Sequence, residues 1–202
     1  MSRDVRFSFL LVVAFFLQVL VTQAHGHGPG MQIIGDQQQI LYPKSGIKYF
    51  CTPADKTPDI NTVRKSSPLD WQTTEESVAN LGFTSEKCWF HLTVRNHNPL
   101  HQNWFLLIDY AMLGEVDAYQ LDAGGNIVSH YQAGMDRDFS VRSSNYPIPA
   151  FPASLPTGVD SDFYILVSSA HSIQLPLSLV SKEQFESGFL TRTLVQGLFF
   201  GG

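Results

Sequence analysis

Residues 89–95 read Trp-Phe-His-Leu-Thr-Val-Arg, and this stretch decides the fold class. Apolar and polar side chains alternate along it, with the period of two that a strand with one buried face requires. One face would carry Phe90, Leu92 and Val94 toward a core. The other face would carry the aromatic and polar side chains Trp89, His91, Thr93 and Arg95. The stretch therefore predicts a half-buried strand of an antiparallel sheet.

Further strand patterns follow along the chain. Residues 115–121 and 126–132 flank Asp122-Ala123-Gly124-Gly125, a predicted hairpin turn whose glycines readily take positive φ. The apolar run 104–110 predicts a central strand buried on both faces. Strands are also expected over 162–168 and 173–179, the second with strict alternation. Since no long amphipathic helix separates them, these strands predict an all-β fold, an antiparallel jelly-roll β-sandwich over residues 40–181.

The segments before the strand at residue 89 are irregular in pattern. Residues 25–39 are rich in Gly, Gln and His and lack periodicity, so they predict a flexible lead-in. Residues 45–79 are broken by prolines and predict an irregular arm. Within this arm we expect a turn of helix over residues 59–64 and packing of Trp71 against the domain.

The two ends of the chain carry apolar runs. Arg3 and Arg6 precede an apolar run and small residues, so residues 1–24 predict a cleaved signal peptide, with an uncleaved anchor as the alternative. Residues 182–202 predict a helical segment whose apolar part begins near Gly188. We expect the start of a truncated first transmembrane helix there; the alternative is a short docking helix.

Charge and cysteine content narrow the function classes. Removal of residues 1–24 takes away Arg3, Arg6 and Asp4, so the net charge changes from -5 to -6, without a basic cluster for nucleic acid. Cys51 and Cys88 would lie in an oxidising compartment, which predicts a disulfide. Two buried free thiols are the alternative.

Five segments together resemble a known family. They are residues 80–85 (NLGFTS), 89–96 (WFHLTVRN), 109–116 (DYAMLGEV), Arg142 with 146–149 (YPIP), and 196–201 (QGLFFG). Their order and spacing over residues 40–202 are similar to the type 2 extracellular domain of seven-transmembrane receptors with diverse intracellular signalling modules (7TMR-DISM). The resemblance implies a periplasmic jelly-roll domain similar to carbohydrate-binding modules. It also implies a seven-helix membrane region followed by a histidine kinase or a cyclic-dinucleotide enzyme.

One residue departs from the family pattern. His91 stands where we would expect an Arg after the Trp-hydrophobe pair. If that Arg contacts a ligand in relatives, this chain would prefer another ligand or bind more weakly at neutral pH.

Two groups of side chains are candidates for ligand binding. On the strand at residue 89, Trp89 could stack on a sugar ring while His91 and Arg95 form hydrogen bonds; alternatively, Trp89 covers the sandwich edge and Arg95 is an ordinary solvated residue. The second group is a polar loop that could clamp a carboxylate or phosphate, or could simply be solvated. Its candidate residues are Asp136, Arg137, Arg142 and Asn145.

These features predict a sensor and not an enzyme. The chain after residue 24 lacks the common catalytic motifs, and neither a cofactor nor a metal site is expected. We expect a periplasmic receptor domain at the bacterial inner membrane that binds a small polar ligand or sugar, with the membrane contacted through the C-terminal segment. The alternatives are a protein-protein interaction module, paired with another receptor or with itself, and a calcium-responsive sensor.

Overall fold

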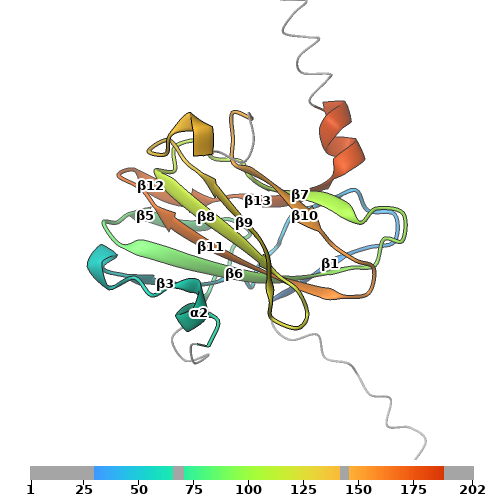
Figure 1. Cartoon of the computed structure of the whole chain (residues 1–202), viewed down its shortest axis with the longest axis horizontal. Helices are drawn as coiled ribbons and strands as arrows, with labels where there is room; N and C mark the ends of the chain where they lie inside the picture. Colours follow the sequence, from blue (N-terminus) through green and yellow to red (C-terminus); the bar gives the residue numbers. More distant parts are fainter. Residues whose placement is uncertain (1–29, 66–70, 142–145, 189–202) are drawn as a thin grey trace, which may run out of the picture.

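The chain folds as an antiparallel β-sandwich of the jelly-roll kind with a short helical end, as a computed structural model shows for residues 30–65, 71–141 and 146–188 (Figure 1). The predicted all-β fold class is confirmed. The predicted signal peptide, residues 1–24, lies outside the described residues, as do residues 189–202, where a membrane segment is expected.

The first sheet is built around β6 (Lys87–Asn96), its longest strand. One edge of β6 pairs with β11 (Asp160–Ser168). The other edge pairs first with β3 (Lys48–Thr52) and then with β1 (Met31–Ile34), which runs parallel to β6. The order is β4-β3-β6-β11-β8-β9, in which the remaining strands are β4 (Gln72–Thr73), β8 (Glu115–Leu121) and β9 (Ile127–Ala133).

The second sheet has the order β10-β7-β13-β2. Its strands are β10 (Ala150–Ser154), β7 (Asn103–Ile108), β13 (Leu177–Ser181) and β2 (Ile40–Leu41). A small third sheet pairs β12 (Ser172–Leu175) with β5 (Ala79–Phe83). The helical pieces are η1 (Ala54–Lys56), α2 (Ile60–Val63), η3 (Phe139–Val141) and residues 182–188.

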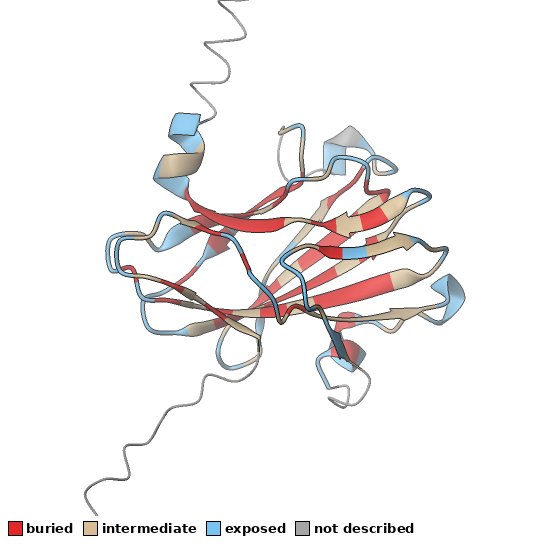
Figure 2. Ribbon diagram, turned by 180° about the vertical axis from the view of Figure 1, so that it is seen from behind, coloured by how far each residue is buried: buried red, intermediate tan, exposed pale blue. Residues whose placement is uncertain are grey.

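The main core lies between the two large sheets, where buried residues line the facing strands (Figure 2). Alternate residues of β6 point into it, as the period of two predicts, and Phe90, Leu92 and Val94 are all buried. The inward residues of β11, Phe163, Ile165 and Val167, are buried beside them. The polar residues of β6 and β11 therefore lie on the outer face of the first sheet.

The predicted hairpin is confirmed: β8 and β9 flank the turn at residues 122–125, and Gly125 has φ 77°. The disulfide is also present, because Cys51 and Cys88 are directly opposite in β3 and β6 and are bonded. The predicted helical turn is α2, with Asp59 as its N-cap. Trp71 packs against Phe50, as expected for a residue that anchors the arm.

The structure corrects the prediction of a flexible lead-in over residues 25–39. Residues 31–34 form β1, and Ile34 is fully buried in the main core. A strand of four residues is too short for its alternation to stand out from sequence. The irregular arm likewise contains β3, whose Lys48–Thr52 run pairs with β6.

Two strand predictions also need correction. The single strand expected over 173–179 is divided at Pro176, which lacks the N–H that a central strand needs, so β12 pairs with β5 and β13 pairs with β7. The run 104–110 ends as a strand at Ile108 and is central in its sheet, but it is fully buried on one face only. Its outward residues Phe105 and Leu107 are half-buried.

The outer face of the first sheet is partly covered by residues 53–65, here called the strap. Ile60 and Val63 of α2 pack on Trp89, Leu121 and Tyr164 and form a second apolar cluster. The strap reaches the β8–β9 turn, where Arg64 Nη1 donates to the Gly125 carbonyl at 2.6 Å. Among the described residues, no helix is long and apolar enough to cross a membrane.

Candidate ligand-binding site

The structure overturns the prediction that Trp89 offers an exposed ring to a ligand. Trp89 does point to the outer face, but only 1% of it is exposed, because the strap covers it. Its Nε1 donates to the Pro58 carbonyl at 3.1 Å, so its polar atom is also satisfied within the chain. Trp89 is thus a core residue of the second cluster and not a stacking platform.

His91 and Thr93 converge on Asp162 of β11. His91 Nε2 lies 2.9 Å from Asp162 Oδ1, and Thr93 Oγ1 donates to the same oxygen at 2.6 Å. Burial alone would raise the pKa of Asp162, but the hydrogen bonds from His91 and Thr93 outweigh burial and lower this pKa. His91 also stacks on Tyr164 with ring centroids 4.4 Å apart, and burial raises the pKa of Tyr164 to about 12.

Arg95 is held by Asp160 in a two-point ion pair. Arg95 Nε donates to Asp160 Oδ1 at 2.6 Å, and Arg95 Nη2 donates to Asp160 Oδ2 at 2.7 Å. The hydrogen bonds that Arg95 donates to this carboxylate raise the pKa of Arg95. A ligand that used the guanidinium here would have to compete with Asp160 for the same donors.

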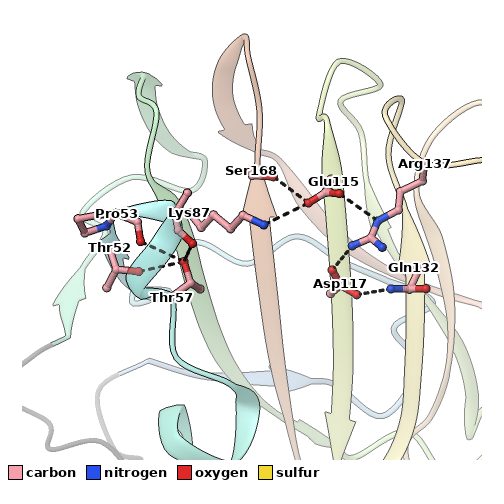
Figure 3. A network of polar contacts seen from close by, with 10 residues as sticks. Thr52, Pro53, Thr57, Lys87, Glu115, Asp117, Gln132, Arg137 and Ser168 are labelled. Atoms are coloured by element: carbon pink, nitrogen blue, oxygen red, sulfur yellow. Dashed lines mark hydrogen bonds and ion pairs between the residues drawn. The ribbon is translucent and has the colours of Figure 1, made fainter.

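Arg137 belongs to a second polar network at the other end of the sheet (Figure 3). Its Nη2 donates to Asp117 Oδ2 at 2.6 Å, and its Nε lies 3.9 Å from Glu115 Oε1. Lys87 Nζ donates to Glu115 Oε2 at 3.3 Å, so both carboxylates are neutralised by cations of the chain. Gln132 Nε2 completes the network by donating to Asp117 Oδ1 at 2.8 Å.

The two predicted groups of residues do not form one site. Lys87 and Arg95 occupy opposite ends of β6, about 26 Å apart by the rise of a strand. Arg137 is linked to the Lys87 end through Glu115, so it is far from the Arg95 end. Asp136 is exposed beside Arg137, while Arg142 and Asn145 lie outside the described residues. The described residues hold no group of three or more potential metal ligands.

A groove that the sequence did not predict lies at the edge of the sandwich. It is lined by residues 30–33, 41–42, 44–46 and 73–75, and its volume is about 730 Å³. This edge groove lies where β1 and β2 are the outermost strands of the two large sheets. Its volume is in the range typical of small-molecule sites, roughly 300 to 1,000 Å³. A second hollow near residues 147–151 has only about 50 Å³, which suits a water molecule or two and not a ligand.

Two glycines allow the walls of the edge groove to meet. Gly30 and Gly46 have φ of 101° and 83°, in the left-handed region that favours glycine. A Cβ on Gly46 would lie 2.6 Å from the Gly30 Cα, so neither residue has room for a side chain. Isolated glycines give no periodic signal in a sequence, so the groove could not be predicted from hydrophobic pattern.

The protein is therefore an all-β sandwich domain. It carries two polar networks on the outer face of its first sheet and a groove of ligand size at its edge. The family described as 7TMR-DISM extracellular 2 matches residues 46–181. The chain belongs to this family, and the predicted family is therefore confirmed. Membership makes it a sensor domain of a membrane receptor family, placed outside the cytoplasm.

No curated protein matches the chain. The solved structure of the enzymatically active domain of tailspike protein 4 from bacteriophage CBA120 is similar at 12% identity with a TM-score of 0.27. The similarity covers 71% of this chain and 18% of that chain, so the present chain spans less than a fifth of its length.

Proposed function

We propose that this domain senses a small polar ligand or a carbohydrate on the periplasmic side of a bacterial inner membrane. The observation that carries the proposal is the match of residues 46–181 to an extracellular domain of membrane receptors. In this proposal residues 1–24 direct export, and the chain after residue 188 connects the domain to the membrane. Ligand binding would bias the receptor between two states, which requires that the ligand binds those states unequally.

The polar clusters give no support to acid-base catalysis as the role of the domain. Asp160 and Asp162 are engaged by Arg95 and His91, and Glu115 and Asp117 are engaged by Lys87 and Arg137. Each of these carboxylates is thus paired with a basic group of the chain. Acid-base catalysis would need a carboxylate within reach of a substrate proton.

A thermal-shift screen of the purified chain tests the proposal. Sugars, amino acids and nucleotides would be compared, since a compound that binds only the folded state raises the melting temperature. The expected result is a concentration-dependent rise with at least one compound class. A melting temperature that no compound changes would overturn ligand sensing.

The same screen tests the residues predicted from sequence. His91, Arg95, Asp136 and Arg137 stay candidates, and Arg95→Ala and Arg137→Ala would show whether either end of the first sheet contributes to binding. Lys56→Ala is the control, because Lys56 is an exposed basic residue of η1.

A second candidate function is an interaction module without a small ligand. It is favoured by β9, the last strand in the first sheet, whose Ile127 and Val128 are 40% and 54% exposed. No charged residue protects this strand from pairing with another strand. Sedimentation of the chain at increasing concentration would show a dimer in this case, and Val128→Lys would abolish it.

A further inference from the structure

We propose that the edge groove is the ligand site and that it takes a neutral, polyhydroxylated ligand of monosaccharide size. The inference rests on the proposed sensory function and adds a place and a chemical class for the ligand. It differs from the predicted residues His91, Arg95 and Arg137, which are engaged by carboxylates of the chain on the outer face of the first sheet.

The first observation is an aromatic ring at the groove. Tyr42 lines the groove and is 67% exposed. An exposed aromatic face can stack on the apolar face of a pyranose ring. Met31 and Ile33 add half-buried apolar surface to the same groove. The groove therefore offers the apolar contacts that one side of a sugar ring needs.

The second observation is a set of polar groups without partners in the described part of the chain. Thr74 lines the groove, and its Oγ1 is buried without a hydrogen-bond partner. Because this oxygen is buried, a ligand in the groove would reach it only after a rotation about χ1. β1 is paired along one edge only, by β6, so alternate peptide groups of its free edge face away from the sheet. Ligand hydroxyls could satisfy both kinds of group.

The charges around the groove favour a neutral ligand. Lys44 and Glu75 both line it and both are exposed, so one cation and one anion are available. An excess of either sign, which would select an anion or a cation, is absent among the described lining residues. Ammonium and carboxylate groups can each bond to sugar hydroxyls, as donor and as acceptor respectively.

The position of the groove suits a sensor. Leu41 lines it and pairs in register with Leu179 of β13, the strand that leads directly into the helix at residues 182–188. His101 joins the same region, because its Nε2 lies 3.3 Å from Gln39 Nε2 and its Nδ1 lies 2.9 Å from Glu183 Oε2. A ligand in the groove would thus touch a strand adjacent to the C-terminal end of the domain.

Nuclear magnetic resonance titration of the isotope-labelled chain tests the site. The probes are glucose, galactose and N-acetylglucosamine, with glucuronate and glutamate as charged comparisons. We expect at least one neutral sugar to shift the backbone amide signals of Gly46 and Thr74 and to leave those of Gly114 and Arg137 unchanged. Tyr42→Ala should weaken the affinity for that sugar roughly three- to tenfold, the loss expected for one aromatic contact.

Phe83→Ala is the matched control, because Phe83 is an aromatic residue that is 83% exposed outside the groove. It should leave the affinity for the sugar unchanged. Sugar-induced shifts confined to the Arg137 end would overturn the groove site and leave ligand sensing intact. Binding of only the charged probes in the groove would overturn the ligand class. A chain that binds none of the probes, and no compound in the thermal-shift screen, would overturn both proposals.

Discussion

Thr74 and Thr93 each carry a hydroxyl group, but these two groups differ in whether they have a hydrogen-bond partner. Thr74 Oγ1 is buried without a partner among the described residues, whereas Thr93 Oγ1 donates to Asp162 at 2.6 Å. A buried hydroxyl without a hydrogen bond destabilises the folded state by roughly 1 to 3 kcal/mol, and a bond to a charged acceptor stabilises it. A ligand that forms a hydrogen bond with the Thr74 hydroxyl would remove this cost.

This contrast gives a prediction for two matched variants. We expect Thr74→Val to raise the free energy of unfolding by about 1 kcal/mol, because it removes the unsatisfied group. Thr93→Val should lower it by about 1 to 2 kcal/mol, because Asp162 loses a donor. Urea unfolding of both variants measures the difference. If Thr74→Val destabilises as much as Thr93→Val, the Thr74 hydroxyl has a partner in solution.

Asp162 predicts a dependence of stability on pH. Burial would raise its pKa, but His91 and Thr93 together with the charge of Lys48 hold the pKa below its ordinary value. A lowered pKa in the folded state stabilises the protein above the unfolded pKa of about 4, and this stability is lost as the pH falls through the folded pKa. Between about pH 5 and pH 2, unfolding measurements should therefore show a steeper loss for the wild type than for Asp162→Asn.

The control for this measurement is Asp138→Asn, at an exposed position. It should leave the pH dependence as steep as in the wild type. Equal slopes for the wild type and Asp162→Asn would mean that the contacts of Asp162 with His91 and Thr93 contribute nothing to acid stability.

The sequence predicts some elements better than others, because some depend on local residues and others on distant pairing partners. The β8–β9 hairpin depends on a local turn and two alternating runs, so it is predictable from its own residues. β1 and β10 depend on distant partners: β1 pairs with β6, and β10 carries Pro152 as the edge strand of its sheet. Their short sequence patterns therefore do not predict a strand unless the pairing partners are known.

The candidate site shows the same limit. The sequence indicates correctly that His91 and Arg95 face away from the core, because alternation determines the face of a strand. It does not show that the strap covers Trp89 or that Arg95 forms an ion pair with Asp160, since both depend on contacts between distant segments. The edge groove depends on a close approach of Gly30 and Gly46, which no pattern encodes.

That close approach can be tested with two glycine variants. Gly46 and Gly158 have similar positive φ values, 83° and 77°, so alanine is strained at both positions. A Cβ at Gly158 meets nothing within 4 Å, whereas one at Gly46 meets the backbone of Gly30 at 2.6 Å. Gly46→Ala should therefore lower the melting temperature clearly more than Gly158→Ala does. Equal losses would show that the contact between Gly30 and the β2–β3 loop adds nothing to stability.

The disulfide gives a further prediction at the scale of elements. Cys51 and Cys88 join β3 to β6 across a sequence separation of 37 residues. Closing a loop of this length restricts the unfolded chain, so reduction should lower the free energy of unfolding by roughly 3 to 4 kcal/mol. Denaturant unfolding with and without reductant measures this loss. The double variant Cys51→Ala with Cys88→Ala should not respond to reductant.

At the scale of the whole molecule, the edge groove and the helical end are connected through the second sheet. β2 contributes Leu41 to the groove and pairs with β13, which continues into residues 182–188. Phe185 of the helical end stacks on Phe105 of β7 with ring centroids 4.2 Å apart and lies 4.5 Å from the Tyr146 ring. In Figure 1 this end (red) stands beside β7 and β10. The arrangement provides a physical link between a ligand in the groove and the chain that follows the domain.

Phe185→Ala tests this link without any ligand. Loss of the stack on Phe105 should free the helical end, so hydrogen exchange at residues 182–188 should become faster. Because Glu183 and Gln39 both contact His101, exchange should also rise in β2, while the β8–β9 hairpin stays unchanged. Lys182→Ala is the control, since its side chain is 52% exposed and pairs only weakly with Glu186 at 3.8 Å. Faster exchange throughout the sandwich would indicate general destabilisation, and faster exchange in the helical end alone would show that it is not coupled to the groove.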